Sequence, residues 1–146
     1  MFLRIIRLLL AAYRRRGALG VFSVLFALLA VSDLLKPLQL GSEPGQVGFV
    51  LFGQRLSGTA NTIAGPLFGI YLLVYALGIW RMKRFALPMG HAYATYVVLN
   101  LIMFTAKNPK PPGVGPVIFG VVYATVAIGV SVGAAYLLTK HKAELS

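Results

Sequence analysis

Residues 115–139 read GPVIFGVVYATVAIGVSVGAAYLLT, a stretch that contains no charged side chain. A helix needs about 20 consecutive apolar residues to cross the hydrocarbon core of a bilayer, which is roughly 30 Å thick. Hydrocarbon offers no water to the peptide groups, so a crossing segment must satisfy its own hydrogen bonds as a helix. This stretch therefore predicts a transmembrane helix, and it decides the fold class of the chain.

The same reasoning identifies three more spans along the chain. They cover about residues 17–35 (GALGVFSVLFALLAVSDLL), 60–80 (ending GPLFGIYLLVYALGIW) and 88–105 (PMGHAYATYVVLNLIMFT). The sequence thus predicts an all-α integral membrane protein with one membrane domain over residues 1–146. We expect a four-transmembrane-helix bundle, and an even number of spans places both termini on the same side.

The composition excludes an ordinary water-soluble domain. Hydrophobic residues make up 58% of the chain and charged residues 12%, whereas a soluble domain has about 25% charged residues. The chain has no cysteine, which excludes disulfides, thiolate nucleophiles and Cys-ligated metal clusters. The net charge of +11 would suggest nucleic-acid binding in a soluble protein. Here the cations flank apolar stretches, so we expect anionic lipid headgroups, and no nucleic acid, as their partner.

The distribution of lysine and arginine predicts the orientation. Most of them precede the first span, separate the second from the third, or follow the fourth, and cytoplasmic loops are the ones enriched in such residues. The residues expected to meet lipid headgroups on that side are Arg4, Arg7, Arg14, Arg15, Arg16, Arg81, Lys83 and Arg84, with Lys140 and Lys142 beyond the fourth span. The opposite side has only Lys36, Arg55, Lys107 and Lys110. Both termini are therefore expected in the cytoplasm.

The first sixteen residues, MFLRIIRLLLAAYRRR, predict a separate amphipathic helix. At about 100° per residue, four of its arginines fall within one arc, while Phe2, Ile5 and Leu9 lie elsewhere. This pattern favours a helix that lies in the cytoplasmic interface, with a turn at Gly17 before the first span. A helix continuous with that span, or a signal peptide, would also place arginines before an apolar stretch.

Small residues predict how the helices associate. The fourth span has one continuous stripe of them and a separate G-x-x-x-G pair, and the second span has another such pair. The residues are Gly120, Ala124, Ala127, Ser131 and Ala134 for the stripe, Gly129 and Gly133 for the first pair, and Gly65 and Gly69 for the second. Small side chains let helices approach closely in lipid. Packing within the bundle is one interpretation, and a face left for another protein is the other.

Few polar side chains fall within the spans, and none forms a catalytic motif. Asp33, near the end of the first span, is expected to pair with Lys36, and a proton or cation site is the alternative. His91 is a candidate axial ligand for a haem or chlorophyll, set against an ordinary hydrogen-bonded histidine. Asn61 and Asn100 are expected to hydrogen-bond between helices. No nucleophile–base pair, metal motif or phosphate loop is present, so we expect no enzyme, and the sequence specifies no cofactor.

Two functions remain open. The stretch GIYLLVYALGIWRMKRFALP is similar to hairpins of many small bacterial membrane proteins, which suggests a bacterial inner membrane but identifies no family. Small size, spare small-residue faces and the amphipathic helix favour an accessory or structural subunit of a larger membrane complex, with other membrane subunits as partners. The alternative is a small homo-oligomeric transporter or channel that uses Asn61, Pro66 and Asn100 along its path.

Overall fold

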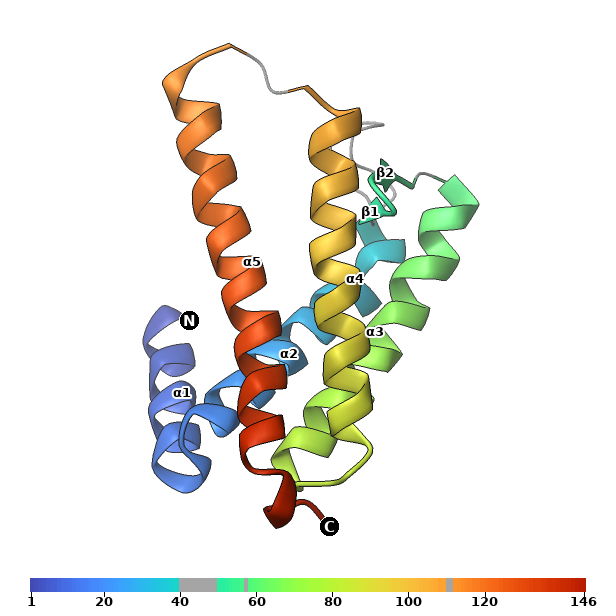
Figure 1. Cartoon of the computed structure of the whole chain (residues 1–146). Coiled ribbons are helices and arrows are strands. Elements are labelled where there is room, and N and C mark those ends of the chain that lie inside the picture. Colours follow the sequence, from blue (N-terminus) through green and yellow to red (C-terminus); the bar gives the residue numbers. More distant parts are fainter. Residues whose placement is uncertain (40–49, 57, 110–111) are drawn as a thin grey trace.

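The computed structural model describes residues 1–39, 50–56, 58–109 and 112–146 of the chain. Expectations about residues 40–49, which include Glu43, and about Lys110 lie outside the described residues. The helices are α1 (Phe2–Arg16), α2 (Ala18–Leu34), α3 (Gly58–Trp80), α4 (Ala86–Lys107) and α5 (Val114–Lys140). Two 3-10 turns, η1 (Lys36–Gln39) and η2 (Lys142–Glu144), and a hairpin of β1 (Val50–Leu51) and β2 (Gln54–Arg55) complete the described elements (Figure 1).

Three of the helices, α3, α4 and α5, are long enough and apolar enough to cross a membrane. The prediction of a helical protein with helices long and apolar enough to cross a membrane is confirmed. The helix α2 has 17 residues, which lies at the short end of the roughly 17–25 residues that a span requires.

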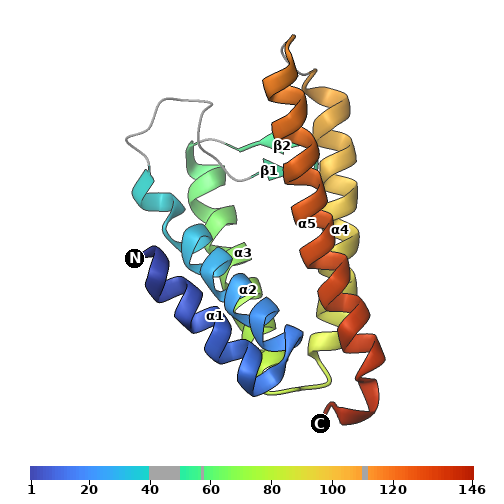
Figure 2. The same cartoon turned by 90° about the vertical axis from the view of Figure 1, so that its left-hand side faces the viewer.

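The helices form two layers (Figure 2). The first layer contains α1, α2 and α3, and the second contains α4 and α5, which run side by side in both views. One end of the molecule has the α1–α2 turn, the α3–α4 connection and the C-terminus; we call it the basic end, because Arg14–Arg16, Arg81–Arg84 and Lys140–Lys142 lie there. The opposite end, called the hairpin end, has β1, β2 and the α4–α5 connection.

The pair α2 and α3 forms the most closely packed part of the structure. Gly69 of α3 lies so close to α2 that an added Cβ would be 2.9 Å from the carbonyl oxygen of Ala30. Deeper in the same contact, the Ser23 hydroxyl donates a 2.7 Å hydrogen bond to the carbonyl of Ala76. Phe26 beside them is fully buried. Small residues thus let the two backbones approach closely enough for a hydroxyl to bond directly to the opposite helix.

The N-terminal helix α1 forms as the sequence predicts, but it runs back alongside α2 rather than across its end (Figures 1 and 2). Gly17 has a φ of 65°, a backbone conformation that glycine adopts without strain, and it reverses the chain between the two helices. Ala12 is buried against Gly20, where an added Cβ would collide with the Ala12 carbonyl. This contact between two small residues holds α1 and α2 together as a helical hairpin. The positions of the arginines in the sequence did not predict it.

The end of the chain ties the two layers together at the basic end. The Ser146 amide donates to the carbonyl of Met82 at 2.8 Å, and the Arg84 amide donates to the Ser146 carbonyl at 3.0 Å. Leu145 between them is buried in the hydrophobic core. The segment after α5 is therefore fixed to the α3–α4 connection by backbone hydrogen bonds and by a buried side chain.

The contact at Gly69 generates a stability prediction. Substituting Gly69→Val places methyl groups against the α2 backbone, and we expect it to destabilise the fold by about 1–3 kcal/mol. The measurement is thermal unfolding of the purified protein in detergent. The control is Gly129→Val, because an added Cβ at Gly129 of α5 meets nothing within 4 Å. Equal melting temperatures for the two variants would show that α2 and α3 are not packed as described.

Candidate functional site

A continuous file of aromatic rings crosses the junction between the two layers. It begins at Phe26 of α2, whose ring centroid lies 4.8 Å from that of Tyr75 and 5.3 Å from that of Tyr93. Phe68 of α3 continues it, 6.0 Å from Tyr93 and 5.2 Å from Tyr96. At the hairpin end, Phe52 meets Tyr96 edge-on at 6.2 Å. We call these six residues, Phe26, Phe52, Phe68, Tyr75, Tyr93 and Tyr96, the aromatic file.

The sequence analysis did not predict the aromatic file. The rings come from α2, α3, α4 and the hairpin, so no single local spacing relates all six of them. Aromatic pairs at 4.5–7 Å stabilise packing by about 0.5–1.5 kcal/mol beyond the area they bury. The file therefore contributes to the attraction between the two layers.

Two tyrosines of α3 differ in how their hydroxyls are satisfied. The Tyr71 hydroxyl donates a 2.7 Å hydrogen bond to the carbonyl of Met89 on α4. The side chain of Tyr75 is fully buried, and in the described part of the chain its hydroxyl has no hydrogen-bond partner. That hydroxyl lies against Gly90 of α4, where an added Cβ would be 2.6 Å away. An unsatisfied hydroxyl in such a place is costly, because neither lipid nor the core can bond to it.

Asp33 is the acid that the sequence places in a span, and it lies half-buried in the last turn of α2. The ion pair with Lys36 stays a prediction, because the side chain of Lys36 lies outside the described residues. No group of three metal-binding side chains occurs among the residues that the structure describes.

In the hydrogen bond that the structure shows for Asn100, the partner is the hairpin and not another helix. Its Oδ1 accepts a 2.9 Å hydrogen bond from the amide of Gly53. Asn61 is buried at the start of α3. The hairpin escaped the sequence analysis because its two-residue turn is Phe52-Gly53, and the strong sequence signals for such a turn are Asn-Gly and Asp-Gly. The turn requires a positive φ at both residues, here 47° at Phe52 and 77° at Gly53. Of the two residues, Gly53 is the one whose type favours such a conformation.

The two histidines are held by separate hydrogen bonds near the basic end. The Nε2 atom of His91 lies 3.0 Å from the Thr139 hydroxyl of α5, which joins α4 to α5. The Nδ1 atom of His141 lies 2.9 Å from the carbonyl of Leu137, one turn back in its own helix. In this arrangement Nε2 of His91 is already engaged, and a metal on that atom would have to displace Thr139.

The small-residue faces have different surroundings. Gly65 and Gly69 of α3 are buried, and Gly69 contacts α2. The stripe of α5 changes along its length: Gly120, Ala124 and Ala127 are half-buried, and Ser131 and Ala134 are buried. Gly129 lies open, whereas an added Cβ at Gly133 would be 3.3 Å from the ring of Phe22. The two glycines of this pair thus face different neighbours.

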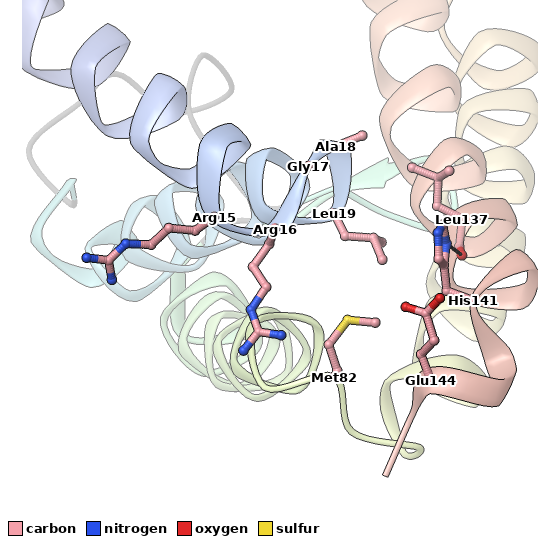
Figure 3. Close-up of a pocket in the computed structure, with 9 residues that line it drawn as sticks. All are labelled: Arg15, Arg16, Gly17, Ala18, Leu19, Met82, Leu137, His141 and Glu144. Carbon is pink, nitrogen blue, oxygen red and sulfur yellow. Dashed lines mark hydrogen bonds between the residues drawn. The ribbon is translucent and has the colours of Figure 1, made fainter.

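The basic residues predicted to meet headgroups lie at the molecular surface. Lys83 is half-buried. The others are exposed, namely Arg4, Arg7, Arg14, Arg15, Arg16, Arg81 and Arg84. A hollow of about 330 Å³ opens at the basic end between the α1–α2 turn and the end of α5. Figure 3 shows Arg15 pointing away from this hollow and Glu144 pointing into it from the side of His141. Its charges are therefore mixed, and the arginines do not converge on one ligand.

No family model, curated protein or solved structure matched this chain in the three comparisons made. The fold itself defines the class: a helical protein with three helices long and apolar enough to cross a membrane.

The contrast between the two tyrosines of α3 gives a paired prediction. We expect Tyr75→Phe to leave stability unchanged or raise it by up to about 1 kcal/mol, because it removes a buried hydroxyl that has no partner. Tyr71→Phe should lower stability by about 0.5–1.5 kcal/mol, because it removes a 2.7 Å hydrogen bond between α3 and α4. Thermal unfolding in one detergent measures both. A loss for Tyr75→Phe as large as that for Tyr71→Phe would mean that the Tyr75 hydroxyl is satisfied after all.

Proposed function

We propose that this chain is a small accessory or structural subunit of a larger membrane protein complex, which it joins by side-to-side packing of α5. The supporting observation is that most of α5 is only partly covered by the rest of the bundle. From Val114 to Val130 no residue is buried, and the buried positions of α5 begin at Ser131. A helix that needed only its own bundle would be expected to contact it along more than its last turns.

The outward face of α5 has features that suit a second helix. It is formed by residues at alternating spacings of four and three, namely Ile118, Val122, Thr125, Gly129, Val132 and Tyr136, all of which are exposed. Gly129 makes a dent in this face, and nothing lies within 4 Å of the position its Cβ would take. Helices in lipid associate where small residues permit close backbone contact, and disordered lipid chains fill such a dent poorly.

The same proposal includes four spans with both termini in the cytoplasm of a bacterial cell. The basic end gathers most of the cations, as the positive-inside rule requires of a cytoplasmic face. It also gathers the starts of α2 and α4 and the ends of α3 and α5, so a chain that runs from a cytoplasmic N-terminus to the start of α3 at the hairpin end would cross the membrane once through α2. With 17 residues, α2 reaches about 25 Å at 1.5 Å per residue, and η1 extends it at the hairpin end.

A small transporter is the second candidate, and the aromatic file supports it. Tyr93 and Tyr96 are only half-buried although they lie between the layers. Pro66 and Asn61 of α3, which the sequence analysis placed along a path, lie on the same helix as Phe68. The subunit is preferred because a transporter would be expected to have more polar side chains within its spans or an internal repeat.

The decisive experiment is native mass spectrometry of the protein purified gently from its own membrane. We expect a second polypeptide in fixed stoichiometry, and we expect Gly129→Leu to abolish its presence because the added side chain fills the dent on α5. The matched control is Gly115→Leu, which adds the same side chain at another open glycine, in the first turn of the same helix.

The melting temperature of each variant shows whether its own fold is intact. A wild-type protein found only as a monomer or homo-oligomer would contradict the subunit proposal, and the homo-oligomer would favour the transporter. Undiminished assembly of Gly129→Leu would exclude the outward face of α5 as the contact.

A further inference from the structure

The turn of the hairpin is held by one face of α4 through three hydrogen bonds. The amide of Gly53 donates to Asn100 Oδ1 at 2.9 Å, and Asn108 Nδ2 donates to the Gly53 carbonyl at 3.2 Å. Lys107 Nζ donates to the carbonyl of Phe52 at 3.1 Å. Three side chains of α4 therefore converge on the peptide groups of two consecutive residues.

The backbones of the turn and the helix also touch directly. A Cβ added to Gly53 would lie 2.7 Å from both the Met103 carbonyl oxygen and the Phe104 amide nitrogen. Gly53 has a φ of 77°, which disfavours other residues even in open space. The close docking thus depends on glycine for two separate reasons, and a matched control can separate them.

The hairpin lies between α3 and α4 at the hairpin end in both views (Figures 1 and 2). It is continuous with the first layer, because only residues 56 and 57 separate β2 from α3. Its contact with α4 therefore links one layer to the other. In the same place the ring of Phe52 meets Tyr96, so the hairpin covers the end of the aromatic file.

Several features limit the stability of this docked state. Each strand has two residues, and a hairpin of that size is not stable in water on its own. Phe52 has a φ of 47°, which is strained for a residue with a bulky side chain. Lys107 and Asn108 are exposed, so water competes for two of the three hydrogen bonds.

We propose that the Val50–Arg55 hairpin is a clasp that opens and closes over the aromatic file. When it is closed, Phe52 covers Tyr96 and the two layers are joined at the hairpin end. When it is open, Tyr96 becomes accessible from that end. The clasp concerns motion within this chain, and it holds whether or not α5 binds another subunit.

Because the chain has no cysteine, a single introduced thiol reports on this motion without background. The probe is Tyr96→Cys, reacted with a membrane-impermeant maleimide in nanodiscs, where reagent reaches both faces and orientation does not matter. We expect slow labelling with the clasp intact. Adding Gly53→Ala should raise the rate about tenfold, which is the effect of losing one docking contact of ordinary strength.

The control for Gly53→Ala is Gly58→Ala. Gly58 also has a positive φ, 59°, but an added Cβ there meets nothing within 4 Å, so the variant imposes strain without breaking the docking. It should leave the labelling rate of Tyr96→Cys unchanged. Val114→Cys, at an exposed position in α5, gives the rate for an open site in every background.

A further variant guards against a failure of Gly53→Ala to fold. Lys107→Met removes one docking hydrogen bond from an exposed side chain and leaves the hairpin sequence intact. It should speed labelling in the same direction. Equal labelling rates for Tyr96→Cys with and without these changes would overturn the clasp. If both rates match that of Val114→Cys, the site is always open, and if both stay far below it, the site is always closed.

Discussion

A peptide group in hydrocarbon finds no water, so every amide and carbonyl within a bilayer must bond inside the protein. That constraint turns the apolar stretches of this chain into helices, and it limits how those helices can meet. Hydrophobic attraction between them is absent in lipid, so contact depends on close packing and on a few polar bonds. The α2–α3 pair satisfies this demand through Gly69 and through the bond from Ser23 to Ala76, and the other elements are arranged around it.

The helices themselves were predictable from sequence, because span length and hydropathy are local properties. The predicted stretches at 60–80 and 115–139 became Gly58–Trp80 and Val114–Lys140. The arrangement in two layers, the aromatic file and the docking of the hairpin were not predictable. They depend on pairs such as Asn100 and Gly53, which lie 47 residues apart and which no periodicity connects. His91 shows the same limit, since its partner Thr139 belongs to another helix.

The position of α1 brings two requirements into opposition. Packing of Ala12 against Gly20 holds α1 alongside α2, with its first turns directed away from the basic end. Arg4 and Arg7 belong to those turns, and an arginine near the centre of a bilayer costs about 2.5–3.5 kcal/mol even by insertion scales. Both arginines are exposed, so their side chains can extend toward the headgroups. A locally thinner bilayer, or a tilt of the helices, would shorten the distance that these side chains have to span.

The four-span topology depends on α2 crossing the membrane, because the direction of this helix sets the direction of the three that follow. With 17 residues, α2 is also the shortest of the proposed spans. Single cysteines at Arg15 and Leu38, exposed positions on either side of α2, test this directly. Labelled with an impermeant maleimide, Leu38→Cys should react in intact cells, and Arg15→Cys should react only in inverted membrane vesicles. Reaction of both cysteines from the same compartment would show that α2 does not cross, and it would contradict the four-span topology.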